Sequence, residues 1–353
     1  MPAFIGLNTG EFLCFLLFWA MNVWIVLRGM DSIKFLETWG SPFLLAVGVA
    51  LFAWALVRAG GLGPMLENPT VGRPDGRTAG VGTLFGAGLT SAVAFWGTMA
   101  LSIPDFSRYA RSQRDQIVGQ AVGLPGTMAL FAFIGAAVTN ATVVIFGTRI
   151  SDPVALLARI GGGPLMIMLS MAGLIVATLT TNIAANIVAP ANGFSNLAPD
   201  KITFKQGAMI TAVIGILMMP WRLYNDAAAY IFTWLIGYGA LLGPVAGIMI
   251  ADYFVVRRGQ LNVNDLYTRD GAYEYARGFN PVAIAALALG VAPSLPGFVA
   301  ALRGVPLTTV FGTIYNWAWF VGFLVAGLLY CAGMRVTGVP VREPTDVRVT
   351  ARD

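Results

Sequence analysis

The chain of 353 residues contains no histidine and only two cysteines, and charged residues make up just 11% of it. Without histidine, the commonest general base and metal ligand is missing. Cys14 and Cys331 lie in separate apolar segments without metal-binding or redox spacing, so we interpret both as packing residues. The charged fraction is less than half of the roughly 25% found in soluble domains, which predicts an integral membrane protein.

Long apolar segments make up most of the sequence. A membrane-spanning helix needs about 20 predominantly apolar residues. The sequence therefore predicts an all-α membrane protein with nine spans, at about residues 11–28, 35–59, 82–103, 117–147, 164–191, 206–221, 226–256, 279–302 and 308–334. We expect residues 1–334 to form one polytopic transmembrane domain and residues 335–353 a polar cytoplasmic tail.

Positive charge is divided unevenly between the loops. Most of the 22 Lys and Arg residues, among them Arg108, Arg257 and Arg335, fall in one set of alternate loops. Cytoplasmic loops are enriched in Lys and Arg, so we expect this side and the C-terminus to be cytoplasmic and the N-terminus external. The net charge of +5 then needs no nucleic-acid partner. An external N-terminus directly before the first span, without a signal peptide, suggests that upstream helices are missing.

A polar stretch from Thr178 to Asn186 lies inside an apolar segment, 164–191, that has no charged residue. Polar groups cost free energy in hydrocarbon unless they are satisfied, so such a stretch is expected to face other helices or a wet cavity. It contains hydroxyls and carboxamides but no acid, base or thiol nucleophile. This inventory favours reversible binding over covalent catalysis.

The hydroxyls and carboxamides of this stretch each allow two interpretations. Thr180 and Thr181 share a helix face with Ala177, and two hydroxyls with a freed carbonyl suit Na⁺; alternatively, threonines bond back to carbonyls of their own helix. Asn182 and Asn186 are four residues apart. A carboxamide matches the alternating donors and acceptors of a nucleobase or hydantoin edge, but it can also link neighbouring helices.

Two spans carry glycines or proline near their middle, with the sequences FWG at 95–97 and GYGALLGP at 237–244. Such residues either allow close helix packing or interrupt a helix and free its backbone for a ligand. Trp96 is a candidate platform for a flat ring. The alternative is the packing or interfacial position expected of most of the nine tryptophans.

Three stretches together resemble the nucleobase–cation symporter-1 family, the purine, pyrimidine, allantoin and hydantoin permeases. They are FWGTMALSIPDFSRYARSQRDQIVGQAVGLP (95–125), TTNIAANIVAPANGFSNLAPDKITFKQG (180–207) and IGYGALLGPVAGIMIADYFVVRRGQLNVNDLY (236–267). The resemblance extends in register across nearly the whole chain, and LYTRDGAYEYARGFNP (266–281) is most similar to the uracil, allantoin and hydantoin branch. It implies the five-plus-five inverted-repeat transporter fold, N-terminally truncated, with this chain resembling helices four to twelve.

The resemblance also implies roles for individual residues. Trp96 would stack on the substrate ring, Phe95 would contribute mainly backbone, and Asn186 would hydrogen-bond the amide edge of the ring. The cation would be bound by the Ala177 carbonyl and the hydroxyls of Thr180 and Thr181, one of which replaces a Ser of some members and keeps the ligand atom. In the family, two helices absent here supply the remaining contacts, so the chain would carry about half of the site.

We therefore expect a symporter, not an enzyme, that imports uracil, allantoin, hydantoin or a related heterocycle through the plasma or inner membrane by alternating access. Na⁺ is favoured over H⁺ because hydroxyl ligands are present and no relay acid is evident. We expect a monomer in the lipid bilayer with no cofactor besides the coupling ion. The alternatives are a transport-inactive fragment of such a permease and a membrane-embedded enzyme, for which the sequence offers no His or Cys/Asp constellation.

Overall fold

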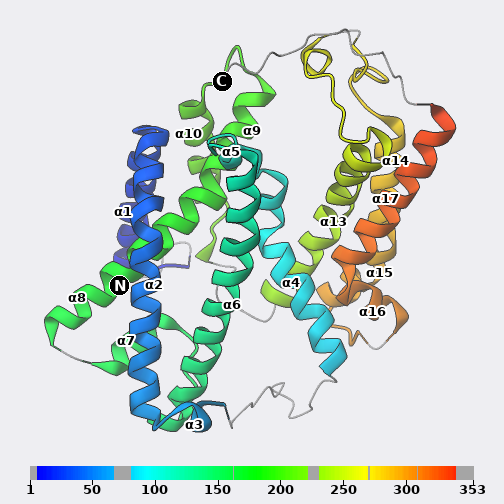
Figure 1. Cartoon of the computed structure of the whole chain (residues 1–353). Helices are drawn as coiled ribbons and strands as arrows, with labels where there is room; N and C mark the ends of the chain where they lie inside the picture. Colours follow the sequence, from blue (N-terminus) through cyan, green and yellow to red (C-terminus); the bar gives the residue numbers. More distant parts are fainter. Residues whose placement is uncertain are drawn as a thin grey trace. The chain divides into compact units, whose positions relative to one another are not determined.

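The structure is a computed structural model, and it describes residues 6–66, 81–161, 163–221, 230–268, 271–307 and 309–338. Regular secondary structure within these ranges is helical, as the sequence predicts (Figure 1). The chain divides into two compact units. Unit 1 comprises Met1–Thr78 and Ser102–Arg222, and unit 2 comprises Ala79–Leu101 and Leu223–Asp353.

Several helices of unit 1 begin at recognisable capping residues. Asn8 and Glu11 form a capping box at the first helix, and Thr203 and Gln206 form another at the last one. Asp152 caps α7, which begins with proline. The helices are α1 (Thr9–Leu27), α2 (Met30–Ala59), α3 (Leu62–Leu66), α5 (Pro104–Ser107), α6 (Gln113–Phe146), α7 (Pro153–Ile160), α8 (Pro164–Asn182), the π-helix η1 (Ile183–Val188), α9 (Ala189–Leu197) and α10 (Phe204–Leu217).

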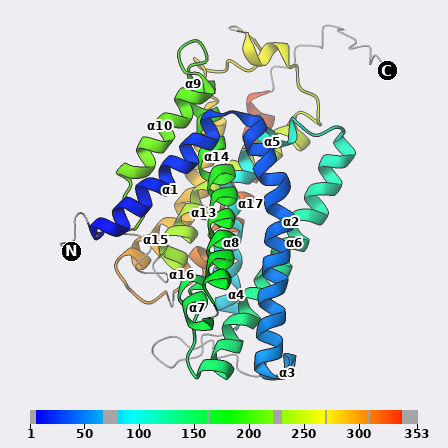
Figure 2. The same cartoon turned by 90° about the vertical axis from the view of Figure 1, so that its left-hand side faces the viewer.

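The buried core of unit 1 that concerns the polar stretch is formed by α1, α2, η1, α9 and α10. Val26 and Ile33 pack there with Ile183 and other apolar residues of η1. Figure 2 shows α1 and α10 side by side. A Cβ atom on Gly207 of α10 would lie 2.4 Å from the carbonyl oxygen of Ala191 in α9, so these two backbones approach at a distance that requires glycine.

Unit 2 is built around the pair α13 and α17, which run side by side (Figure 1). Cβ atoms on Gly243 and Gly247 of α13 would lie 2.3 Å and 2.2 Å from the carbonyl oxygens of Trp319 and Phe323 in α17. The elements are α4 (Val81–Leu101), the π-helix η2 (Tyr230–Leu235), α13 (Ile236–Ile250), the π-helix η3 (Ala251–Val256), the short 3₁₀-helices η4 (Asn264–Tyr267) and η5 (Ala292–Ser294), α14 (Pro281–Val291), α15 (Leu295–Leu302), α16 (Val310–Asn316) and α17 (Ala318–Thr337).

The described residues contain seven helical segments that are long and apolar enough to cross a membrane: Thr9–Leu27, Met30–Ala59, Gln113–Phe146, Ile167–Leu197, Tyr230–Val256, Pro281–Leu302 and Ala318–Thr337. Two shorter apolar helices, Phe85–Leu101 and Phe204–Leu217, lie at the other two predicted spans. The chain is thus a multi-pass membrane protein. Of the predicted tail, residues 339–353 lie outside the described residues.

The two glycine-containing spans are not broken in their middle. Helix α4 runs through Trp96 and Gly97, and α13 runs through Pro244. A Cβ atom on Gly97 would lie 2.9 Å from Cδ1 of Leu242, so this glycine brings α4 close to α13. Of the two interpretations, close packing is therefore correct. The irregular backbone lies at the two ends of α13, in the π-helices η2 and η3.

Candidate functional site

The polar stretch 178–186 lies where α8 passes into the π-helix η1. Asn182 is the last residue of α8 and Asn186 lies within η1. A π-helix holds one more residue per hydrogen-bonded turn than an α-helix, and such turns occur frequently at functional sites. Apolar periodicity does not distinguish the two kinds of helix, so the sequence predicted only a continuous α-helix here.

Three asparagine side chains of unit 1 form a continuous chain of hydrogen bonds, which we call the amide chain. Asn186 Nδ2 donates to Asn182 Oδ1 at 2.9 Å, and Asn182 Nδ2 donates to Asn22 Oδ1 at 3.0 Å. Asn22 Nδ2 then donates to the backbone carbonyl of Phe18 at 2.8 Å. Asn22 belongs to α1 and is only 2% exposed, whereas Asn186 is exposed. The helix-linking interpretation thus holds, because the amides link α1 to α8. Asn186 remains accessible, and its pairing with a ring stays a prediction.

Sequence reasoning missed Asn22. Its only signal is that it is a carboxamide in the middle of the apolar span 11–28. Such a residue is expected to find a polar partner on another helix. The partner could not be identified because Asn22 and Asn182 are 160 positions apart in the chain.

The predicted cation ligands lie close to the amide chain in sequence. The Thr180 hydroxyl donates to the carbonyls of Val176 and Ala177, each at 3.0 Å, and Thr180 is 5% exposed. Its Cγ2 packs on Gly40 of α2, where a Cβ atom would lie 2.7 Å away. These are the back-bonds of the alternative interpretation, and they bring Ala177 and Thr180 together. The hydroxyl oxygen and the carbonyl each keep a lone pair for a cation, while Thr181 is exposed.

Phe95 and Trp96, the predicted ring contacts, lie in α4 and thus in unit 2. Their rings meet edge to face with centroids 5.4 Å apart, and Phe95 is 48% exposed. Trp96 Nε1 is buried and has no hydrogen-bond partner among the described residues. Buried indole N–H groups usually have a partner, so this donor is available to a ligand.

Side-chain hydroxyls of α4 and α16 bond to the π-helix η2. Ser91 of α4 donates to the carbonyl of Ile231 at 3.1 Å, and the hydroxyl of Tyr315 donates to the carbonyl of Thr233 at 2.9 Å. Both acceptors lie in η2, whose wider turns depart from α-helical hydrogen bonding. The helix that carries Trp96 is therefore anchored one turn before the tryptophan.

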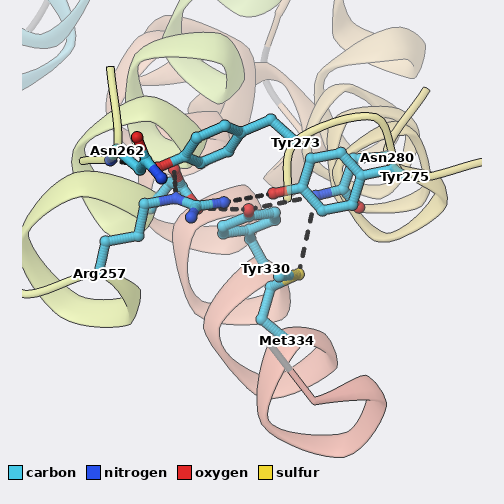
Figure 3. A network of polar contacts seen from close by, with 8 residues as sticks. Arg257, Asn262, Tyr273, Tyr275, Asn280, Tyr330 and Met334 are labelled. Atoms are coloured by element: carbon cyan, nitrogen blue, oxygen red, sulfur yellow. Dashed lines mark hydrogen bonds and ion pairs between the residues drawn. The ribbon is translucent and has the colours of Figure 1, made fainter. Parts of the chain in front are cut away.

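A second polar network lies around the C-terminal end of η3, where the candidate span Tyr230–Val256 ends (Figure 3). Arg257 Nε is 2.8 Å from Asp252 Oδ2, and another nitrogen of Arg257 donates to Tyr275. The Tyr330 hydroxyl donates to Asp252 Oδ1 at 2.7 Å and accepts from Asn280 at 3.2 Å. Burial by itself would lower the pKa of the Arg257 guanidinium, but the hydrogen bond and charge of Asp252 outweigh it and raise that pKa.

Glu37 is a carboxyl that sequence reasoning passed over. It lies in α2, three residues before Gly40, the glycine against which Thr180 packs. Its Oε1 atom is buried and has no hydrogen-bond partner in the part of the chain that the structure describes. Lys34, one turn earlier, lies instead over the ring of Tyr109 at 4.1 Å. An acid in such a position is a candidate ion or proton carrier.

Comparisons with known proteins place these features in a family. A family model described as permease for cytosine/purines, uracil, thiamine, allantoin matches residues 1–322. The purine-uracil permease NCS1 of Arabidopsis thaliana is 45% identical over 329 residues, which are 92% of this chain and 54% of that protein. The allantoin permease of Bacillus subtilis (strain 168) is 42% identical over 333 residues, which are 94% of this chain and 65% of that protein. The chain thus spans about half to two thirds of the length of these relatives.

Among solved structures, the chain is similar to Mhp1, a nucleobase–cation-symport-1 family transporter, in a closed conformation with bromovinylhydantoin bound. The TM-score is 0.69 at 29% identity, and the match covers 94% of this chain and 69% of that chain. The inward-facing conformation of Mhp1 matches with a TM-score of 0.66. The predicted transporter fold is confirmed by this likeness.

Proposed function

The chain belongs to the family of permeases for cytosine and purines, uracil, thiamine and allantoin, and we propose that it binds and imports a nucleobase or related heterocycle together with a cation. The observation that carries the proposal is the amide chain, which presents the accessible carboxamide of Asn186 from within an apolar span. Uracil, allantoin and hydantoin rings all offer amide edges that a carboxamide can pair with. The names of the relatives, a purine-uracil permease and an allantoin permease, support this class of substrate.

Two kinds of contact with the substrate ring are proposed, a hydrogen bond and an aromatic stack. Asn186 would hydrogen-bond the amide edge, and Trp96, whose buried Nε1 atom has no partner among the described residues, would stack on the ring beside Phe95. Aromatic stacking contributes about 0.5–1.5 kcal/mol beyond the burial of area. We expect Trp96→Ala to weaken binding of uracil about ten-fold and Trp96→Phe to weaken it less.

Sodium remains our proposed coupling ion. The Ala177 carbonyl and the hydroxyls of Thr180 and Thr181 would supply hard oxygen ligands without a formal charge, and Mhp1 is described as a nucleobase–cation-symport-1 family transporter. A proton is the second candidate, and Glu37 is the observation that favours it. Either ion drives uptake only by as much as its affinity differs between the outward-open and inward-open states.

Uptake of radiolabelled uracil and allantoin by the protein in proteoliposomes tests both proposals. With Na⁺ outside, we expect accumulation above that of empty liposomes, and we expect Thr181→Val to remove it because a methyl replaces one ligand oxygen. Equal uptake in Na⁺-free buffer would reject sodium. If a pH gradient then drives uptake and Glu37→Gln abolishes it, the proton is the coupling ion. Absence of any uptake of either ring contradicts transport of these substrates.

We further propose that the protein resides in the cell membrane as a monomer, with the side rich in Lys and Arg in the cytoplasm. Arg257 and Arg258 follow the end of η3, and Arg335 lies in the last turn of α17. All three would then be cytoplasmic. Labelling of single cysteines is a direct measurement. The Arg258→Cys variant should react with a membrane-impermeant thiol reagent only after the cells are opened, and labelling of intact cells would contradict this orientation.

A further inference from the structure

The amide chain ends on an atom that can only accept a hydrogen bond, the carbonyl oxygen of Phe18. Asn22 must therefore turn its Nδ2 toward Phe18, which leaves its Oδ1 facing Asn182. Asn182 must in turn donate to that oxygen, so its own Oδ1 faces Asn186. The direction of every amide is thus set from the buried end, and the last amide is left with one possible orientation.

In the structure, Asn186 Nδ2 lies 2.9 Å from Asn182 Oδ1. The opposite orientation of the Asn186 carboxamide would place its Oδ1 against that oxygen instead. Two acceptors would then face each other, and one N–H bond would be lost. Losing a hydrogen bond at this exposed position costs about 0.5–1.5 kcal/mol. The inner members cannot easily turn to relieve this contact, because Asn22 is 2% exposed and packed within α1.

We propose that Asn22 and Asn182 are positioning residues that orient the Asn186 carboxamide, so that the site selects rings with an N–H donor beside a carbonyl acceptor. This inference rests on the proposed function. In the fixed orientation, Asn186 presents its free Oδ1 and the second hydrogen of Nδ2 to a ligand. The Oδ1 accepts from a ring N–H, and the remaining Nδ2–H donates to the adjacent ring carbonyl. A ring whose nitrogens carry methyl groups leaves Oδ1 without a donor and is rejected.

The test compares the affinities of three rings for the purified protein by titration calorimetry. Uracil carries two N–H groups, dimethyluracil carries methyls on both ring nitrogens, and thymine adds a methyl on carbon while it keeps both N–H groups. We expect the wild-type protein to bind dimethyluracil at least ten-fold more weakly than uracil, as for a buried polar group that loses its partner. Thymine controls for the bulk of a methyl group.

Replacements at Asn182 separate orientation from packing. Asn182→Leu removes the acceptor for Asn186, and we expect uracil affinity to fall about ten-fold and the preference for uracil over dimethyluracil to shrink to about two-fold. Asn182→Gln keeps a carboxamide with both the donor for Asn22 and the acceptor for Asn186, so the ring preference should remain. If both variants change the preference alike, Asn182 acts through packing and the proposal fails.

A double-mutant cycle tests whether Asn22 acts through Asn186. We expect Asn22→Leu to weaken uracil binding about ten-fold in the wild-type background and to have no further effect when Asn186 is replaced by Ala. Asn192→Leu is the matched control, since Asn192 is also a buried asparagine of unit 1 but lies outside the amide chain. An equal loss in both backgrounds overturns the positioning role alone. A wild-type protein that binds none of the rings overturns the proposed function as well.

Discussion

The amide chain of unit 1 and the Arg257–Asp252 network of unit 2 both connect helices through polar side chains, one with neutral groups and the other with charged ones. The amide chain lies within helices long enough to span a membrane, and each of its members is neutral. The second network contains a full ion pair and lies at the end of η3, where the polar loop begins. Its Arg257 side chain is 7% exposed and its Asp252 side chain 25% exposed.

The difference follows from what each kind of group costs in a membrane. A charged side chain at the centre of a bilayer costs several kcal/mol, whereas an interhelical amide hydrogen bond contributes on the order of 1 kcal/mol. Neutral amides can therefore lie within a span and present a ligand-binding edge at low cost. An ion pair is placed where water and loop residues can share its solvation, and there it joins η3, the polar loop and α17 (Figure 3).

The largest expected effect on stability comes from breaking the ion pair. Asp252→Ala leaves the Arg257 guanidinium poorly exposed and without its carboxylate, and it also removes the acceptor of the Tyr330 hydroxyl. We expect a loss of about 3 kcal/mol in the free energy of unfolding, measured by titration with a denaturing detergent. The pair of Asp105 and Arg108, at 3.7 Å, provides the control because its arginine side chain is exposed.

In the control, Asp105→Ala should cost about 1 kcal/mol or less, because the Arg108 side chain is 50% exposed and water replaces its partner. Equal losses in the two variants would mean that burial of Arg257 does not matter. The contrast between an ionic network at the boundary and neutral amides within a span would then lose its energetic basis.

A smaller effect is expected where the backbones around the amide chain meet. Gly207→Ala places a Cβ atom 2.4 Å from the Ala191 carbonyl oxygen and must separate α9 from α10. We expect a cost of about 1–3 kcal/mol in the free energy of unfolding. Gly215→Ala lies on the same helix with open space around its Cβ position, and it should stabilise by about 0.5 kcal/mol. If both variants change the free energy of unfolding in the same direction, the close approach of α9 and α10 at Gly207 is contradicted.

Much of the fold could be predicted from the sequence because membrane spans are set by composition and length alone. The close-packing interpretation of Gly97 also depends on local chemistry, and the structure confirms it. Sequence could not predict the π-helices, since η1, η2 and η3 differ from α-helix by one residue per turn within equally apolar segments.

The polar residues of the candidate site could be predicted from the sequence, but the residues that they contact could not. The stretch 178–186 stood out because polar groups are rare in an apolar span. That Asn182 pairs with Asn22, or that Thr180 meets Gly40, depends on which helices pack together, and one sequence does not carry that information. Glu37 was passed over because its distance from the end of α2 does not reveal that Oε1 is buried.

The smallest expected effect separates a buried asparagine that has partners from one that lacks them. Asn22→Leu removes an acceptor from Asn182 and a donor from Phe18, so we expect it to cost about 1 kcal/mol in the free energy of unfolding. Asn192 Nδ2 is buried without a hydrogen-bond partner among the described residues, so Asn192→Leu should be neutral or slightly stabilising. If Asn192→Leu costs as much as Asn22→Leu, the stability contributed by Asn22 comes from side-chain packing. In that case the amide chain would orient Asn186 without measurably holding α1 to α8.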